Sequence, residues 1–109
     1  MYEIQPMAES VLQHLGQIYS SRGLRNVHVA DVYTVLHEAA RVNLAVVRLP
    51  EDDDDLYHQG IHTHPTPAQR VLAQELRQWM RCEFTGASEQ DLSAALHQAA
   101  AWVAAMFAE

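Results

Sequence analysis

Apolar residues recur at intervals of three and four along most of this chain, which is the periodicity of amphipathic helices. The pattern fills four stretches of the 109 residues: 6–19, 32–43, 67–80 and 92–107. An apolar stripe on a helix must be covered by another element, and a chain of this length builds one core of ordinary size. We therefore predict an all-α fold, with a single helical domain over residues 1–109 that forms an irregular four-helix bundle.

The first helix is marked at both ends. Pro6 suits the first turn, where no backbone N–H is needed for the helix, and the apolar face continues to Tyr19. Gly23 follows and can adopt the left-handed conformation that closes a helix. We expect this helix to end between Ser20 and Gly23.

The second helix has a clear apolar face but less distinct ends. We expect Asn26 or a nearby residue to cap its start, although β-branched valines follow closely. The segment 44–49 (LAVVRL) either prolongs this helix or forms a short buried strand, because periodicity does not separate the two in so short a run. Pro50 ends either structure. A small α+β fold with a strand at 44–49 is the alternative to the all-α bundle.

The third and fourth helices begin with distinct capping signals. Thr66 is the expected N-cap of the third helix, with Pro67 in the first helical position and Gln69 placed to complete a capping box. Gly86 provides a stop, and Ser88 is the expected N-cap of the fourth helix. So short a link favours an antiparallel αα-hairpin at the end of the bundle.

The apolar faces of the four helices predict the core. We expect one largely buried cluster that contains Leu15, Leu36, Leu72, Leu76, Trp79, Leu96, Trp102 and Val103.

Charge is unevenly distributed. The net charge is −7, and residues 50–65 carry five acidic residues and no basic one. Binding to nucleic-acid phosphates depends on clustered cations, so we expect no direct binding of nucleic acid. All seven basic residues are arginine, which is typical of a GC-rich bacterial or phage coding sequence.

An acidic, histidine-containing loop is predicted at 51–65, where four aspartates precede His58, His62 and His64. Neutral imidazole binds transition metals well, and carboxylates can complete the coordination sphere. A site for zinc or nickel at the three histidines is one interpretation. The other is that they are ordinary solvated residues of a loop.

No sequence signature of an enzyme is present. Residues 62–65 (HTHP) resemble the histidine pair of JAMM-type zinc isopeptidases, but the following helical segment lacks the serine and aspartate of that family. The single cysteine, Cys82, excludes an internal disulfide and is predicted to be structural. The chain shows neither a secretory signal nor an apolar run long enough for a membrane span, so we expect a cytoplasmic protein.

Two surfaces are candidate partner interfaces. Arg70, Arg77 and Arg81 share one outer stripe of the third helix, which is either a solvated face that pairs with acidic neighbours or a surface for an acidic protein partner. The fourth helix has no charged residue between Asp91 and Glu109, and helices that are apolar on every side are normally covered on every side. Either this helix is central in the bundle, or a second subunit covers a surface formed by Ala94, His97, Ala101 and Ala105.

These observations predict a protein without catalytic activity that acts by association. We expect a small cytoplasmic protein-interaction module, such as an adaptor, inhibitor or regulator, that forms a homodimer. The alternative function is binding or sensing of a divalent transition metal at His58, His62 and His64.

Overall fold

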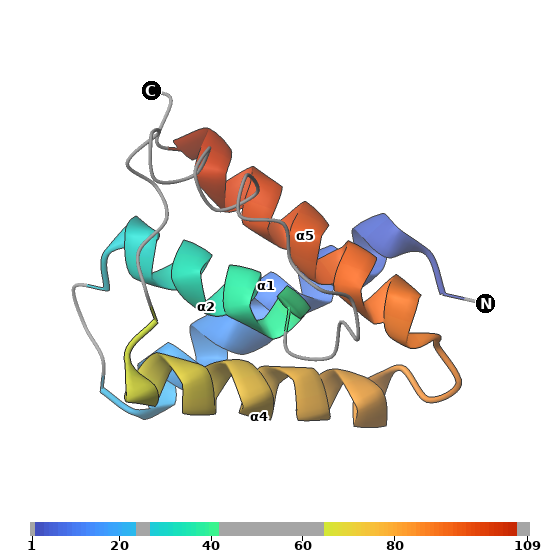
Figure 1. Cartoon of the computed structure of the whole chain (residues 1–109), viewed down its shortest axis with the longest axis horizontal. Coiled ribbons are helices and arrows are strands. Elements are labelled where there is room, and N and C mark those ends of the chain that lie inside the picture. Colours follow the sequence, from blue (N-terminus) through green and yellow to red (C-terminus); the bar gives the residue numbers. More distant parts are fainter. Residues whose placement is uncertain (1, 24–26, 42–64, 107–109) are drawn as a thin grey trace.

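In the computed structural model, residues 2–23, 27–41 and 65–106 are described, and they form four helices and no strand (Figure 1). The elements are α1 (Ile4–Ser21), α2 (Val29–Arg41), α4 (Pro67–Glu83) and α5 (Glu89–Ala105). The predicted all-α class with a helical bundle is confirmed. Residues 44–49, where the alternative strand was predicted, lie outside the described residues.

The predicted helix ends agree closely with the described ones. Pro6 lies in the first turn of α1, and Gly23 follows its last turn with a φ of 68°. At the start of α4, the Thr66 hydroxyl accepts the Gln69 N–H at 3.2 Å, and the Gln69 side chain accepts the Thr66 N–H at 2.8 Å. Ser88 caps α5 by accepting the Asp91 N–H at 3.0 Å. The capping box and the serine cap are confirmed.

A histidine side chain supports the start of α2. The Nδ1 atom of His28 accepts the backbone N–H of Ala30 at 3.1 Å, and the His28 carbonyl accepts the N–H of Asp31 at 2.9 Å. Asn26 lies outside the described residues. The cap thus comes from a residue near Asn26, and β-branched Val29 is the first helical residue.

The helices enclose one core, in which α5 packs against α1 and α2, and α2 also packs against α4. Buried alanines on both α2 and α5 allow these two helices to make the most extensive contact in the bundle. Consecutive α4 and α5 run in opposite directions from a short turn but diverge (Figure 1). Along their lengths α4 and α5 make little contact with each other. Helix α4 packs mainly against α2, and α5 packs against α1 and α2.

Most of the predicted core is buried. The leucines and the valine of the predicted cluster are at most 6% exposed: Leu15, Leu36, Leu72, Leu76, Leu96 and Val103. Trp79 and Trp102 are only partly buried and pack against the outside of the cluster. Trp79 stacks on the His14 ring at 3.9 Å between centroids, and Trp102 lines a pocket. The large tryptophan rings therefore border the core instead of filling it.

Within the described ranges, every helix falls short of the length and apolar character that a membrane span requires.

Candidate functional site

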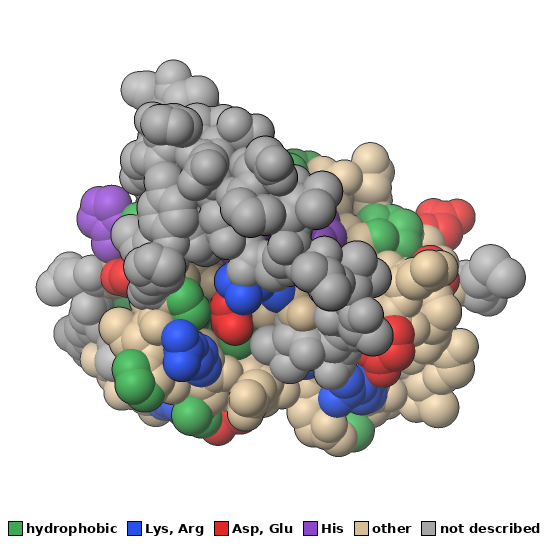
Figure 2. Space-filling view, viewed as in Figure 1, with side chains coloured by type: hydrophobic (Ala, Val, Ile, Leu, Met, Phe, Trp, Pro, Cys, Tyr) green, Lys and Arg blue, Asp and Glu red, His purple; other side chains and the backbone are tan. Residues whose placement is uncertain are grey.

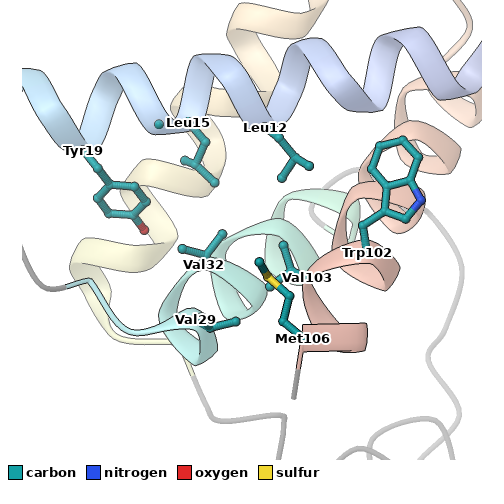
Figure 3. A pocket seen from close by; sticks show the side chains of 9 residues that line it. Leu12, Leu15, Tyr19, Val29, Val32, Trp102, Val103 and Met106 are labelled. Carbon is teal, nitrogen blue, oxygen red and sulfur yellow. The ribbon is translucent and has the colours of Figure 1, made fainter. Parts of the chain in front are cut away.

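An apolar pocket of about 360 Å³ opens between α1, α2 and α5 (Figure 3). Leu12, Leu15 and Tyr19 project into it from α1, and Val29 and Val32 from α2 (Figure 3). The α5 side is formed by the residues of its last turns. The described lining is completed by Gly16, Trp102, Val103 and Met106.

The described lining of this pocket carries no charged side chain. Its polar side-chain groups are the Tyr19 hydroxyl and the Trp102 indole N–H. Burial, with a smaller effect from the carboxylate of Asp31, raises the pKa of Tyr19, so its hydroxyl is protonated at neutral pH and can donate or accept a hydrogen bond. This chemistry suits the burial of an uncharged apolar group and supplies no acid–base pair.

Gly16 is an exposed glycine that also lines the pocket from α1. It lies within an 18-residue helix, where a glycine destabilises the fold by roughly 0.5–1 kcal/mol relative to an alanine. A Cβ atom at this position would meet no described atom within 4 Å. Gly16 is exposed, so packing within the described chain does not account for the glycine.

The predicted interface residues of the fourth helix lie on the outer face of α5. His97, Ala101 and Ala105 are exposed, and Ala94 is partly exposed. The opposite face is buried against α1 and α2 through Ala95, Ala99, Ala100 and other residues. Central packing thus explains half of the alanine-rich helix, and it leaves the outer alanines uncovered.

The predicted arginine stripe on α4 is wrong at its middle position. Arg70 is exposed and Arg81 partly exposed, but the Arg77 side chain is 1% exposed. Arg77 follows Ala73 by four residues and precedes Met80 by three, and both are buried. This helical spacing places Arg77 on the buried side of α4 and could have revealed the error from sequence.

The buried Arg77 guanidinium joins three helices. Its Nη1 atom donates to the Ala39 carbonyl at 3.2 Å and to the Ser93 hydroxyl at 2.8 Å. Its Nη2 atom donates to the Glu89 carboxylate at 2.7 Å and to the Glu89 carbonyl at 3.1 Å, and Nε also reaches the carboxylate. Ser93 in turn donates to the Ala40 carbonyl at 3.2 Å. We call Arg77, Glu89 and Ser93 the arginine cluster.

The arginine cluster ties backbone carbonyls of α2 to the first turn of α5. The carbonyls of Ala39 and Ala40 belong to the last described turn of α2. The Glu89 carboxylate lies in the first turn of α5, where the dipole is positive. The cluster therefore has a structural role, which explains why Arg77 is not available to an acidic partner.

Figure 2 shows arginine and acidic side chains interspersed over one face of the molecule. Among the described residues, Arg22 pairs with Glu75 at 2.7 Å and Arg81 pairs with Glu89 at 2.9 Å. The described part of this face thus presents no extended basic surface.

A pH dependence follows from Glu89, whose pKa is lowered by hydrogen bonds from Arg77 and then Arg81. A carboxylate whose pKa is lowered in the folded protein stabilises the fold at pH values above its pKa in the unfolded chain, which is about 4.3. This stabilisation is lost as the pH falls through the lower pKa of the folded protein. We expect Glu89→Gln to reduce the free energy of unfolding by about 1 kcal/mol at pH 7, since Glu89 is half exposed. In urea denaturation, the parent and Glu89→Gln should have the same free energy of unfolding below pH 4. A difference between them that grows on acidification would contradict the stabilising role of the Glu89 carboxylate.

Other candidate residues stand apart from these sites. His58, His62 and His64 and the acidic segment before them lie outside the described residues, so the metal site remains a prediction. Among described residues, no group of three or more His, Cys, Asp or Glu side chains could hold a metal ion. Cys82 is exposed and its thiol is free, so it does not lie at the edge of the core as expected for a structural cysteine.

A comparison with protein-family models found no match for this chain, and comparisons with curated proteins and with solved structures also found none.

Proposed function

We propose that the protein is a small interaction module that associates through the outer face of α5, with a homodimer as its assembled form. The observation that carries the proposal is the absence of charge on an exposed helix face. No charged residue occurs from Leu92 to Met106, while Ala101 and Ala105 on the outer face are exposed. Exposed apolar surface of this kind is more often part of an interface than left open to water.

The sequence of this face is compatible with close approach of a second helix. Ala94, Ala101 and Ala105 have small side chains, which let helix backbones come near one another. A two-fold axis beside α5 would set the helix against its own copy, with the same residues contributed by both subunits. An adaptor, inhibitor or regulator would use this face either for its own dimer or for a partner of similar apolar character.

Charge on the proposed face should separate the subunits. We expect Ala101→Glu and Ala105→Glu each to convert the dimer to monomer at about 100 μM, because an unpaired carboxylate is costly to bury in a contact. Both sites are exposed in the subunit, so thermal unfolding should stay cooperative. Light scattering coupled to size-exclusion chromatography measures the mass directly.

Ala68→Glu provides a matched control, because Ala68 is exposed on α4 and away from the proposed face. This variant should keep the mass of the unmodified protein. An unmodified protein that is monomeric at the same concentration would refute the homodimer, and binding to a different apolar partner would then be the remaining form of the proposal.

A further inference from the structure

We propose that the pocket between α1, α2 and α5 binds a small uncharged apolar molecule, namely an aromatic or branched aliphatic compound with one hydroxyl or carbonyl group. The proposal does not depend on self-association, because the pocket lies within a single subunit.

The size of the pocket fits such a ligand. Its volume of about 360 Å³ is within the range of roughly 300–1,000 Å³ that small-molecule sites occupy. It is formed by side chains from three helices that also pack in the core, including buried Leu15 and Val103. The walls are therefore largely preformed, which reduces the entropy lost when a ligand binds.

The lining determines the charge of the ligand. Every described side chain around the pocket is uncharged, and most are aliphatic or aromatic. Transfer of an ionised group into such surroundings is unfavourable without a paired charge, whereas an apolar body gains from leaving water. The Tyr19 hydroxyl provides one hydrogen-bonding group, and its oxygen lies on the pocket side of α1 (Figure 3).

Gly16 lies at the exposed edge of the same pocket, on α1. Leu12, Gly16 and Tyr19 follow one another at helical spacing on the pocket side of α1, so a side chain at position 16 would lie between its two neighbours. No described atom fills that space. A larger side chain at this position would therefore have room to extend over the pocket opening.

The test uses Trp102, which lines the pocket, as a fluorescent reporter. Trp79→Phe leaves Trp102 as the only tryptophan, and the probe is 4-bromobenzyl alcohol, a neutral aromatic alcohol whose bromine quenches indole fluorescence. We expect saturable quenching. The charged analogue 4-bromobenzoate, of similar size, should bind at least about tenfold more weakly. Quenching that does not saturate, or that is equal for both probes, would overturn the proposal.

Two variants then locate the binding site. Gly16→Leu should weaken binding of the neutral probe by about tenfold or more, because leucine occupies the pocket. It should also raise the melting temperature, since leucine is a better helix former than glycine. Gln17→Leu, at the next and exposed position, should leave binding within about twofold, as Gln17 is not part of the described pocket lining. Unchanged binding in Gly16→Leu would refute the site.

The same titration on Ala101→Glu separates the two proposals. This variant should bind the neutral probe as the parent does, because Ala101 is not among the described lining residues. Loss of probe binding with loss of the dimer would show that the ligand occupies the subunit contact and not the pocket.

Discussion

Replacement of Arg77 by methionine is expected to lower the free energy of unfolding by about 3 kcal/mol, because hydrogen bonds to charged groups contribute about 1.5–3 kcal/mol each and a buried acceptor left unsatisfied costs about 1–3 kcal/mol. Methionine fills much of the space of the arginine stem but donates no hydrogen bond. The Ala39 carbonyl and the Glu89 carboxylate would both lose this donor. Urea denaturation measures this loss of free energy. The slope of the free energy of unfolding against urea concentration should be the same as in the unmodified protein.

Two further arginine variants make this test specific. Arg77→Lys should recover only part of the stability, since a single ammonium group cannot reach the acceptors on α2 and α5 that the guanidinium contacts together. Arg70→Met, on the exposed side of the same helix, should change stability by less than about 0.5 kcal/mol. Equal effects of Arg70→Met and Arg77→Met would contradict the structural role of the arginine cluster.

The sequence predicted the local parts of the fold because their causes are local. The Thr66 capping box and the Gly23 terminus involve residues within a few positions of each other, and both are present. The apolar periodicity likewise identified the leucines of the core. The short link correctly predicted that α4 and α5 run in opposite directions. Their divergence did not follow from it, since α4 packs on α2 whereas α5 packs on both α1 and α2.

Arg77 shows why a stripe of charge cannot be assigned to the surface from spacing alone. The guanidinium is buried because its acceptors come from the end of α2 and the start of α5, and the sequence does not show that these ends meet. The buried neighbours at positions 73 and 80 carried the available signal. An arginine side chain is usually expected to be exposed to solvent. The Arg77 side chain is buried because buried acceptors pair with its guanidinium group.

The outer face of α5 could be anticipated from its sequence, whereas the pocket could not. The lack of charge along α5 is visible in the chain, and Ala101 and Ala105 are indeed exposed. The pocket combines residues of α1, α2 and α5 that are up to about 90 positions apart, so it exists only once the helices have packed.

Truncation of the core leucines is expected to have the second large effect. Leu76 on α4 and Leu96 on α5 are both 0% exposed and belong to one cluster. Replacement of a fully buried leucine by alanine removes its favourable transfer from water and leaves a cavity, which together cost roughly 2–5 kcal/mol. Each variant should therefore lose this amount in urea denaturation.

Val71→Ala is the matched control on α4, because Val71 is 52% exposed and its truncation should cost less than about 0.5 kcal/mol. Leu96 should lie toward the upper end of the range, since α5 packs against both α1 and α2 and can move little to close a cavity. Losses below about 1 kcal/mol at both leucines would show that these helices are not tightly packed, and the arrangement of α1, α2 and α5 that forms the pocket would then be wrong.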